Sequence, residues 1–168
     1  MTKIYPMRVV SDADVLIHLS KLEKLSLLQA LYKEVAVPEH VKSEILVRED
    51  TVLQHAFNLF LKVATTSKDK AEKIAKRHNI HIGEAHVKVL GEEMKATLFL
   101  SNERKVRKAA KEEGFAVSGT IGIILKAVKV GLIQKSEAGA LLGKMKTKDF
   151  RIHPEILLQK AISAIKEL

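Results

Sequence analysis

The chain has 168 residues, of which 46% are hydrophobic and 29% charged, so it is long enough for one well-packed domain and short for two. It contains no cysteine, which excludes disulfide bonds, thiolate metal sites and cysteine nucleophiles. Its net charge of +9 favours a polyanionic partner, or alternatively a heavily charged surface of the kind found in thermophilic proteins.

The first half of the chain alternates short apolar runs with helical patterns. Residues 7–11 are apolar apart from Arg8 and predict a buried strand, which ends at Asp12 where a helix over 12–20 begins. The elements expected next are a helix over 22–32, a strand over 34–38 and helices over 39–46, 52–63 and 67–79.

The second half continues the alternation. We expect a helix over 83–94, a strand over 97–100, a helix capped at 101–102, a strand over 115–117 and a helix over 119–130. The tail adds a helix over 136–145, an extended piece near 150–152 and a helix over 154–167. This order predicts an α/β fold with a short, mainly parallel sheet covered on both faces. We expect a single domain over 1–168, with 132–168 as a helical appendage.

Four acidic residues fall at corresponding places in these elements. Asp12 ends the first strand, Glu44 lies in the helix after the second, Glu84 starts the helix before the third, and Glu103 follows the third. Ligands of open parallel sheets bind at the carboxyl edge, where Asp12 and Glu103 meet if their strands are neighbours. Carboxylate oxygens suit Mg²⁺ or Mn²⁺, which activate nucleophiles for phosphoryl displacement.

Each of these acids also has a structural explanation to weigh. Acids near helix N-termini are common because they complement the helix dipole, and this accounts for each glutamate taken alone. Asp12 is different, because a carboxylate directly after a buried strand is costly to leave without a partner.

Further residues near the acids are candidates for supporting roles. Asp14, Ser101 and Asn102 could hydrogen-bond the ligands, although helix capping also explains Asp14 and Ser101. Surface or helix-end positions explain the seven histidines better than a metal site does. Five basic residues beyond Glu103 are expected to position phosphates: Arg104, Lys105, Arg107, Lys108 and Lys111.

The order of these segments resembles the PIN-domain nucleases. Residues 9–17 (VVSDADVLI) resemble the opening motif, in which an aspartate ends the first strand, and residues 35–45 (VAVPEHVKSEI) resemble the second motif. Residues 83–85 (GEA) resemble a helix start, and 119–122 (GTIG) a turn, of the VapC-like ribonuclease toxins. Residues 100–107 (LSNERKVR) align with the segment that carries the third-strand acid.

The resemblance implies a PIN-like three-layer α/β/α sandwich and a metal-dependent endoribonuclease. It implies that Asp12, Glu44, Glu84 and Glu103 bind Mg²⁺ or Mn²⁺ for the hydrolysis of single-stranded RNA. A small antitoxin protein and a homodimer are the implied partners. Two positions depart from the pattern, since Glu103 stands where the family usually has aspartate and Asn102 where the subfamily often has one.

Two other functions are compatible with the sequence. A PIN fold that has lost catalysis would bind RNA or a partner protein without cutting. The segment from Asp12 to Val15 also fits the first motif of haloacid-dehalogenase-like phosphatases, with Asp12 as nucleophile. That family needs a late pair of aspartates, and Asp149 is the only aspartate after Gly119.

The sequence also bears on location. No apolar stretch is long enough to span a bilayer, and residues 1–6 lack the apolar core of a signal peptide. We therefore expect a cytoplasmic protein without a membrane partner.

Overall fold

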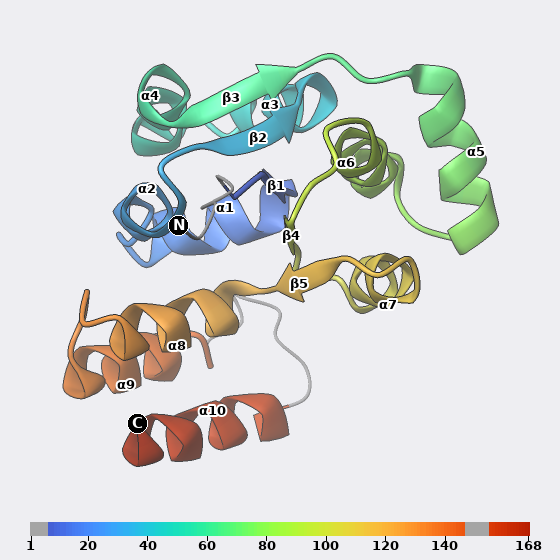
Figure 1. Ribbon diagram of the computed structural model, residues 1–168. Helices are drawn as coiled ribbons and strands as arrows, with labels where there is room; N and C mark the ends of the chain where they lie inside the picture. Colours follow the sequence, from blue (N-terminus) through green and yellow to red (C-terminus); the bar gives the residue numbers. More distant parts are fainter. Residues whose placement is uncertain (1–6, 147–154) are drawn as a thin grey trace, which may run out of the picture.

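The computed structural model describes residues 7–146 and 155–168, with side chains from residue 159 onward in the second segment. Its core is a five-stranded parallel sheet in the order β3-β2-β1-β4-β5 (Figure 1). The strands are β1 (Val9–Ser11), β2 (Val35–Pro38), β3 (Leu61–Ala64), β4 (Leu98–Leu100) and β5 (Ala116–Ser118). The helices are α1 (Ala13–Lys21), α2 (Ser26–Tyr32), α3 (Glu39–Leu46), α4 (Thr51–Leu59), α5 (Lys68–His78), α6 (Ile82–Glu93), α7 (Arg104–Glu112), α8 (Thr120–Lys129), α9 (Lys135–Lys144) and α10 (Glu155–Glu167).

The strand order reverses between β1 and β4. From β1 the chain moves outward to β2 and β3, and from β4 it moves to β5 on the opposite side. The two central strands pair in parallel, with Ser11 beside Leu100, so the residues that follow them leave the sheet side by side. Such a reversal opens a crevice at the carboxyl edge, which is where ligands bind in open α/β sheets. The condition set by the sequence, that the first and third predicted strands are neighbours, is therefore met.

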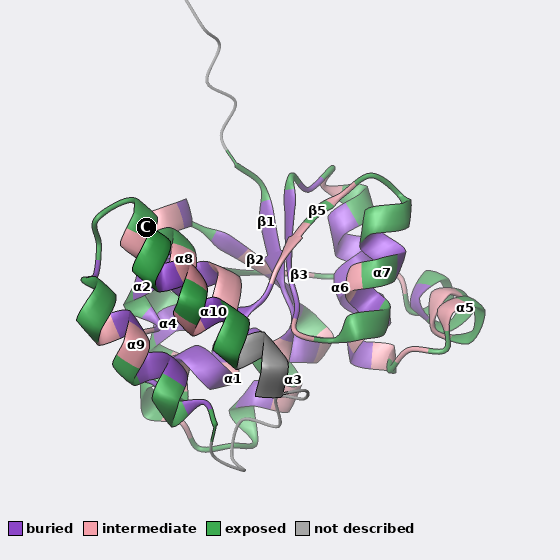
Figure 2. Ribbon diagram, turned by 90° about the horizontal axis from the view of Figure 1, so that it is seen from below, coloured by how far each residue is buried: buried purple, intermediate pink, exposed green. Residues whose placement is uncertain are grey.

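Helices cover both faces of the sheet, as the alternation predicted. In Figure 2, α5, α6 and α7 lie on one side of the strands, and α1, α2, α4, α8, α9 and α10 on the other. The strands β1 and β4 are buried throughout, because both of their faces are covered. The three-layer α/β/α arrangement expected from the sequence is the one observed.

The core is continuous from the first strand to the last helix. Val10, Phe99 and Leu142 are fully buried, and together with Ile165 they belong to one cluster of apolar side chains. The helices α9 and α10 pack against each other and against α8. The C-terminal helices thus contribute directly to the core beneath the sheet.

A buried charge fixes α6 relative to α7. The side chain of Lys88 is only 2% exposed, and its Nζ donates to Glu92 at 2.8 Å and to Glu113 at 2.5 Å. Since a buried ammonium without partners is very costly, these contacts hold α6 and the end of α7 together. The helix that carries Glu84 is therefore held against the helix that follows Glu103.

One strand was missed, and one helix was predicted too long. The helix expected over 52–63 ends at Leu59, and residues 61–64 form β3, which pairs with β2 at the edge of the sheet. The segment from Leu59 to Ala64 is apolar apart from Lys62 and continues the pattern of α4, and pairing with β2 makes residues 61–64 a strand. Two boundaries also move: α2 begins at Ser26, and Glu103 is the N-cap of α7 in place of residues 101–102. The predicted extended piece at 150–152 lies outside the described residues.

Candidate functional site

Asp12 lies at the reversal point of the sheet. It follows β1, is only 4% exposed, and caps α1, where its Oδ1 accepts a hydrogen bond from the Val15 N–H at 3.1 Å. Its own N–H donates to the carbonyl of Leu100 at 3.1 Å, and the Ser101 side chain bonds its carboxylate. The carboxylate is therefore held by a residue of α1 and by the residue that follows β4, while the backbone of Asp12 is bonded to β4.

The pKa of Asp12 is raised to about 7. Burial is the main cause, because it disfavours the charged form, and the nearby charges of Asp14 and Glu84 act in the same direction. The hydrogen bonds from Ser101 and Val15 oppose this shift without cancelling it. An acid held in this way has much to gain from a cation.

Glu84 lies within electrostatic reach of the other three acids. It lies in the first turn of α6, where its Oε2 accepts from the His81 N–H at 2.9 Å in a capping box. Burial raises the pKa of Glu84, the His81 hydrogen bond lowers it, and the charges of Glu103 and Glu44 raise it further. The structure thus brings Glu84 near Asp12 on one side and near Glu103 and Glu44 on others.

Glu44 and Glu103 are the more exposed members of the set. Glu44 has a 37% exposed side chain and lies beside Gly83, where a Cβ atom would come within 2.7 Å of its Oε1. Glu103 is exposed and makes no capping bond with its side chain, while its N–H donates to Ser101 Oγ at 3.1 Å. Both side chains can therefore move more freely than that of Asp12.

Asn102 connects three elements around the site. Its Oδ1 accepts from the Thr120 N–H at 2.8 Å, and its Nδ2 donates to Thr120 Oγ1 at 2.9 Å. The same Nδ2 lies 3.1 Å from His18 Nδ1 and 3.3 Å from Asp14 Oδ2. Asn102 thus connects α1 to the start of α8. Glycine is required at position 119, because a Cβ atom there would meet Asn102 Oδ1 at 2.5 Å.

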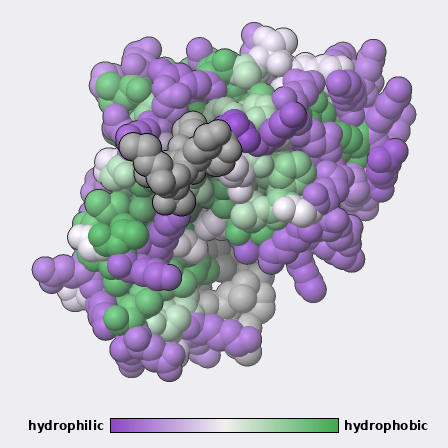
Figure 3. Space-filling view, in the orientation of Figure 1, coloured by the Kyte–Doolittle hydropathy of each residue, from purple (hydrophilic) through white to green (hydrophobic). Residues whose placement is uncertain are grey.

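The basic residues of α7 divide into two kinds. Lys105 Nζ donates to the carbonyl of Asn79, and Arg107 donates to the carbonyl of Ser101, so both have structural partners. Arg104, Lys108 and Lys111 are exposed. In the view of Figure 3, hydrophilic residues line the margin of the molecule over α5 and α7.

The acids offer oxygen donors of the kind that Mg²⁺ and Mn²⁺ take. Across the described parts of the chain, no three Asp, Glu or His side chains are already arranged to hold a metal ion. Mg²⁺ keeps several of its waters and needs only one or two carboxylates, so the pair of Asp12 and Glu84 fits it. A cation near them would also offset the burial that is the main cause of both raised pKa values, and the charge of Glu84 that adds to the shift at Asp12.

The sequence interpretation undervalued two histidines. His86 is 6% exposed, and its ring stacks on that of His40 with centroids 4.9 Å apart. Burial and the nearby His40 lower the pKa of His86. His81, in contrast, is a helix-end residue as expected, since it caps α6. Only the tertiary contact of α3 with α6 brings the two rings together, so no local pattern could reveal them.

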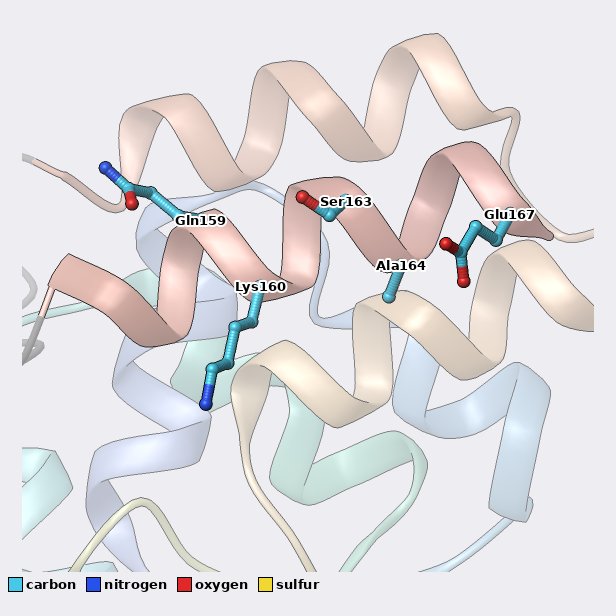
Figure 4. A pocket seen from close by; sticks show the side chains of 5 residues that line it. All are labelled: Gln159, Lys160, Ser163, Ala164 and Glu167. Atoms are coloured by element: carbon cyan, nitrogen blue, oxygen red, sulfur yellow. The ribbon is translucent and has the colours of Figure 1, made fainter.

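One surface pocket has none of the four acids in its lining. The pocket in Figure 4 is lined by five residues of α10 alone: Gln159, Lys160, Ser163, Ala164 and Glu167. Because a single helix provides its whole lining, it is a surface depression and not a cleft between elements. The carboxyl edge of the sheet, where Asp12 lies within electrostatic reach of Glu84, is therefore the better candidate for chemistry.

A parallel α/β sandwich with acids at its reversal point defines a PIN-like fold, and comparison with solved structures agrees. The crystal structure of PAE2754 from Pyrobaculum aerophilum matches with a TM-score of 0.52 and 13% identity, over 71% of this chain and 88% of that one. A family model described as PIN domain matches residues 8–167, so the chain belongs to the PIN-domain family and has a nuclease fold. No curated protein matches it.

The family match favours the resemblance to PIN domains over that to haloacid-dehalogenase-like phosphatases. PIN domains are generally nucleases, and they typically use divalent metals. Within the described segments, every helix is too short or too polar to cross a membrane.

Proposed function

We propose that this protein is a divalent-metal-dependent endoribonuclease that hydrolyses phosphodiester bonds in single-stranded RNA. The observation that carries the proposal is the buried carboxylate of Asp12, which lies within electrostatic reach of Glu84 at the point where the strand order reverses. A buried acid beside a second acid is unfavourable unless a cation joins them. The net charge of +9 supports a polyanionic substrate.

Each residue of the site has a role in this proposal. Asp12, Glu84, Glu103 and Glu44 hold Mg²⁺ or Mn²⁺, with Asp12 as the most rigid donor. The bound ion would lower the pKa of a water nucleophile and neutralise charge on the phosphate. Ser101 fixes Asp12 through the hydrogen bond to its carboxylate.

The surroundings of the acids then position the RNA. Asn102 and Asp14 keep α1 in register with the start of α8 through the contacts at Asn102 Nδ2. The exposed basic residues of α7, beginning next to Glu103, hold phosphates beside the scissile bond. The four acids repel the phosphates of RNA, and the basic residues of α7 at the same edge of the sheet offset this repulsion.

The test is cleavage of labelled single-stranded RNA by wild type and Asp12→Asn with Mn²⁺, Mg²⁺ or EDTA. Products that require metal and disappear in Asp12→Asn are the expected result. Asparagine caps helices as well as aspartate does, so the variant should fold normally, which circular dichroism checks. Cleavage that persists in a folded Asp12→Asn protein would contradict the proposal.

A PIN-fold protein that binds RNA without cutting is the second candidate. It is favoured by Glu103, which is exposed, and by Asn102, whose amide is occupied by Thr120 where the subfamily often has an acid. This function predicts salt-sensitive RNA binding that is equal in wild type and Asp12→Asn, without products under any metal condition.

The proposed nuclease could act as the toxin of a toxin–antitoxin pair and as a homodimer. The toxin role predicts growth arrest when the protein is produced in cells, and relief of that arrest by Asp12→Asn. Light scattering of the purified protein measures whether it is dimeric. Normal growth with active nuclease present would rule out the toxin role and leave the nuclease proposal standing.

A further inference from the structure

Glu44 is surrounded by imidazole rings that the carboxylate set does not account for. His40 lies one turn before it in α3, with Nε2 3.3 Å from Glu44 Oε1, an ion-pair distance when the ring is protonated. His81 Nδ1 lies 3.9 Å from the same oxygen. Both rings come from elements that meet at the edge of the carboxylate cluster, since α3 packs against α6.

The two rings are not equivalent. His81 Nδ1 already accepts from the Gly83 N–H at 3.2 Å as the cap of α6, so its place is set by the helix. His40 is held by a neighbour of another kind, because its ring stacks on His86 with an interplanar angle of 14°. His86 in turn is fixed by Thr66, whose hydroxyl lies 2.6 Å from His86 Nδ1.

These contacts form a continuous support behind Glu44. It runs from Thr66, in the connection between β3 and α5, through the buried ring of His86 in α6 to His40 in α3. A ring supported on its face has little freedom, so its Nε2 stays directed at the carboxylate of Glu44. A flexible glutamate side chain loses rotamer freedom when it is held in this way.

Glu44 gains from such support because His81 lies farther from its Oε1, at 3.9 Å, than His40 does at 3.3 Å. Burial is the main cause of the raised pKa of Glu84, and the charges of Glu103 and Glu44 raise it further, so Glu44 and Glu84 repel each other. The side chain is 37% exposed, so it could swing toward solvent and leave the cluster. An imidazole on the outer side opposes this movement.

We propose that His40 is a positioning residue that holds Glu44 for cation binding, and that the stacked ring of His86 holds His40. The inference rests on the proposed function, since it assigns His40 a role toward the same metal. It goes beyond that function because it names an imidazole, outside the four acids, on which metal affinity depends. Outer contacts of this kind are general at metal sites, where their loss weakens binding.

The experiment measures binding of Mn²⁺ alone, without RNA, by titration calorimetry. His40→Leu should weaken Mn²⁺ binding by about 10- to 100-fold, as loss of a contact behind a metal ligand does. His40→Gln, whose amide can still donate to Glu44, should recover most of the affinity. The His40 side chain is 36% exposed, so leucine has room and the fold should persist, which circular dichroism checks.

A double-mutant cycle separates positioning from a general effect on the fold. In the Glu44→Gln background, His40→Leu should cause no further loss of Mn²⁺ affinity, because its only route to the metal is Glu44. His55→Leu is the matched control, since His55 is an exposed histidine on α4, and its Mn²⁺ affinity should equal that of wild type.

The outcomes distinguish the two proposals. Equal Mn²⁺ affinity of His40→Leu and wild type, or an equal loss in both backgrounds, would overturn the role of His40 while the metal site stands. Absence of Mn²⁺ binding by the wild type would overturn the proposed function and this inference with it.

Discussion

At the scale of single residues, the buried carboxylate of Asp12 destabilises the metal-free folded protein when it is ionised. Asp12 has a pKa of about 7 because it is buried and faces other acids. The folded protein therefore binds this proton more tightly than the unfolded chain does. The resulting instability is fully present above pH 7 and fades as the pH falls toward the ordinary value near 4.

Asp12→Asn should consequently stabilise the metal-free protein. At pH 8 in EDTA we expect its free energy of unfolding to rise by at most about 4 kcal/mol, the full equivalent of the raised pKa. The gain should shrink steadily as the pH is lowered toward 4. Urea denaturation at several pH values measures it, and a variant less stable than wild type at pH 8 would contradict the assignment.

Gly83→Ala also separates stability from function, in the same direction as Asp12→Asn. An alanine Cβ there would meet the flexible end of Glu44 at 2.7 Å, and Gly83 has no positive φ that alanine would strain. Gly83→Ala should therefore keep or raise stability, by at most about 1 kcal/mol, while Glu44 is displaced and Mn²⁺ binds more weakly. Gly139→Ala is the control, because a Cβ there meets open space.

Some residues of the site can be recognised from the sequence alone, and others cannot. Asp12 follows from local chemistry, since a carboxylate after a buried strand needs a partner. The residues that support Glu44 cannot be recognised from local chemistry. Thr66, His86 and His40 are far apart in the chain and meet only through the packing of α3 against α6. Isolated histidines without spacing carry no signal of such a stack.

At the scale of elements, α7 joins the carboxylate edge to a basic surface. The helix begins directly after Glu103, and its buried face consists of Val106, Ala109 and Ala110. Two of its basic residues also serve the fold, since Lys105 bonds Asn79 and Arg107 bonds Ser101. The exposed residues Arg104, Lys108 and Lys111 make no hydrogen bond of this kind to the backbone of the described residues, so they are suited to bind phosphate.

Arg104→Gln and Lys108→Gln should weaken RNA binding without changing the fold. In EDTA, where no cleavage occurs, each should lower the slope of log affinity against log salt by about 1. Lys129→Gln, at the far end of α8, is the charge-matched control and should leave the slope unchanged. Equal slopes for all variants would show that α7 is only a solvated face.

The boundary between α4 and β3 shows where a sequence pattern fails to predict the structure. The strands β1, β2, β4 and β5 follow from apolar runs bounded by turn or helix signals, and the structure contains them. β3 was missed because its exposed residues Lys62 and Val63 give no alternation and its start continues the apolar pattern of α4. Pairing with β2 is a non-local contribution that the segment itself does not encode.

At the scale of the whole molecule, one topological feature places the site. Because the chain leaves β1 toward one edge and β4 toward the other, the segments after these strands diverge and leave a crevice between them. Asp12 and Ser101 border this crevice, and α6 brings Glu84 to it from the connection before β4. The acids are spread over the chain, so the site depends on the whole sheet being formed.

The continuity of the core predicts that the chain unfolds as one unit. Leu142 of α9 is fully buried in the same cluster as Val10 of β1, so Leu142→Ala should cost about 2–5 kcal/mol and lower the midpoint of a single transition. Leu132→Ala, at a 43% exposed position, should change stability by less than about 1 kcal/mol.

Urea denaturation followed by circular dichroism gives the midpoint, and Mn²⁺ protection in the same experiment reports on the site. If the C-terminal helices were an independent appendage, Leu142→Ala would produce a second, earlier transition, and Mn²⁺ would still shift the later one alone. With one shared core, Mn²⁺ bound at Asp12 stabilises α9 as much as β1, because ligand binding stabilises every element that unfolds with the site. Both variants should then show a single transition that Mn²⁺ moves to higher urea.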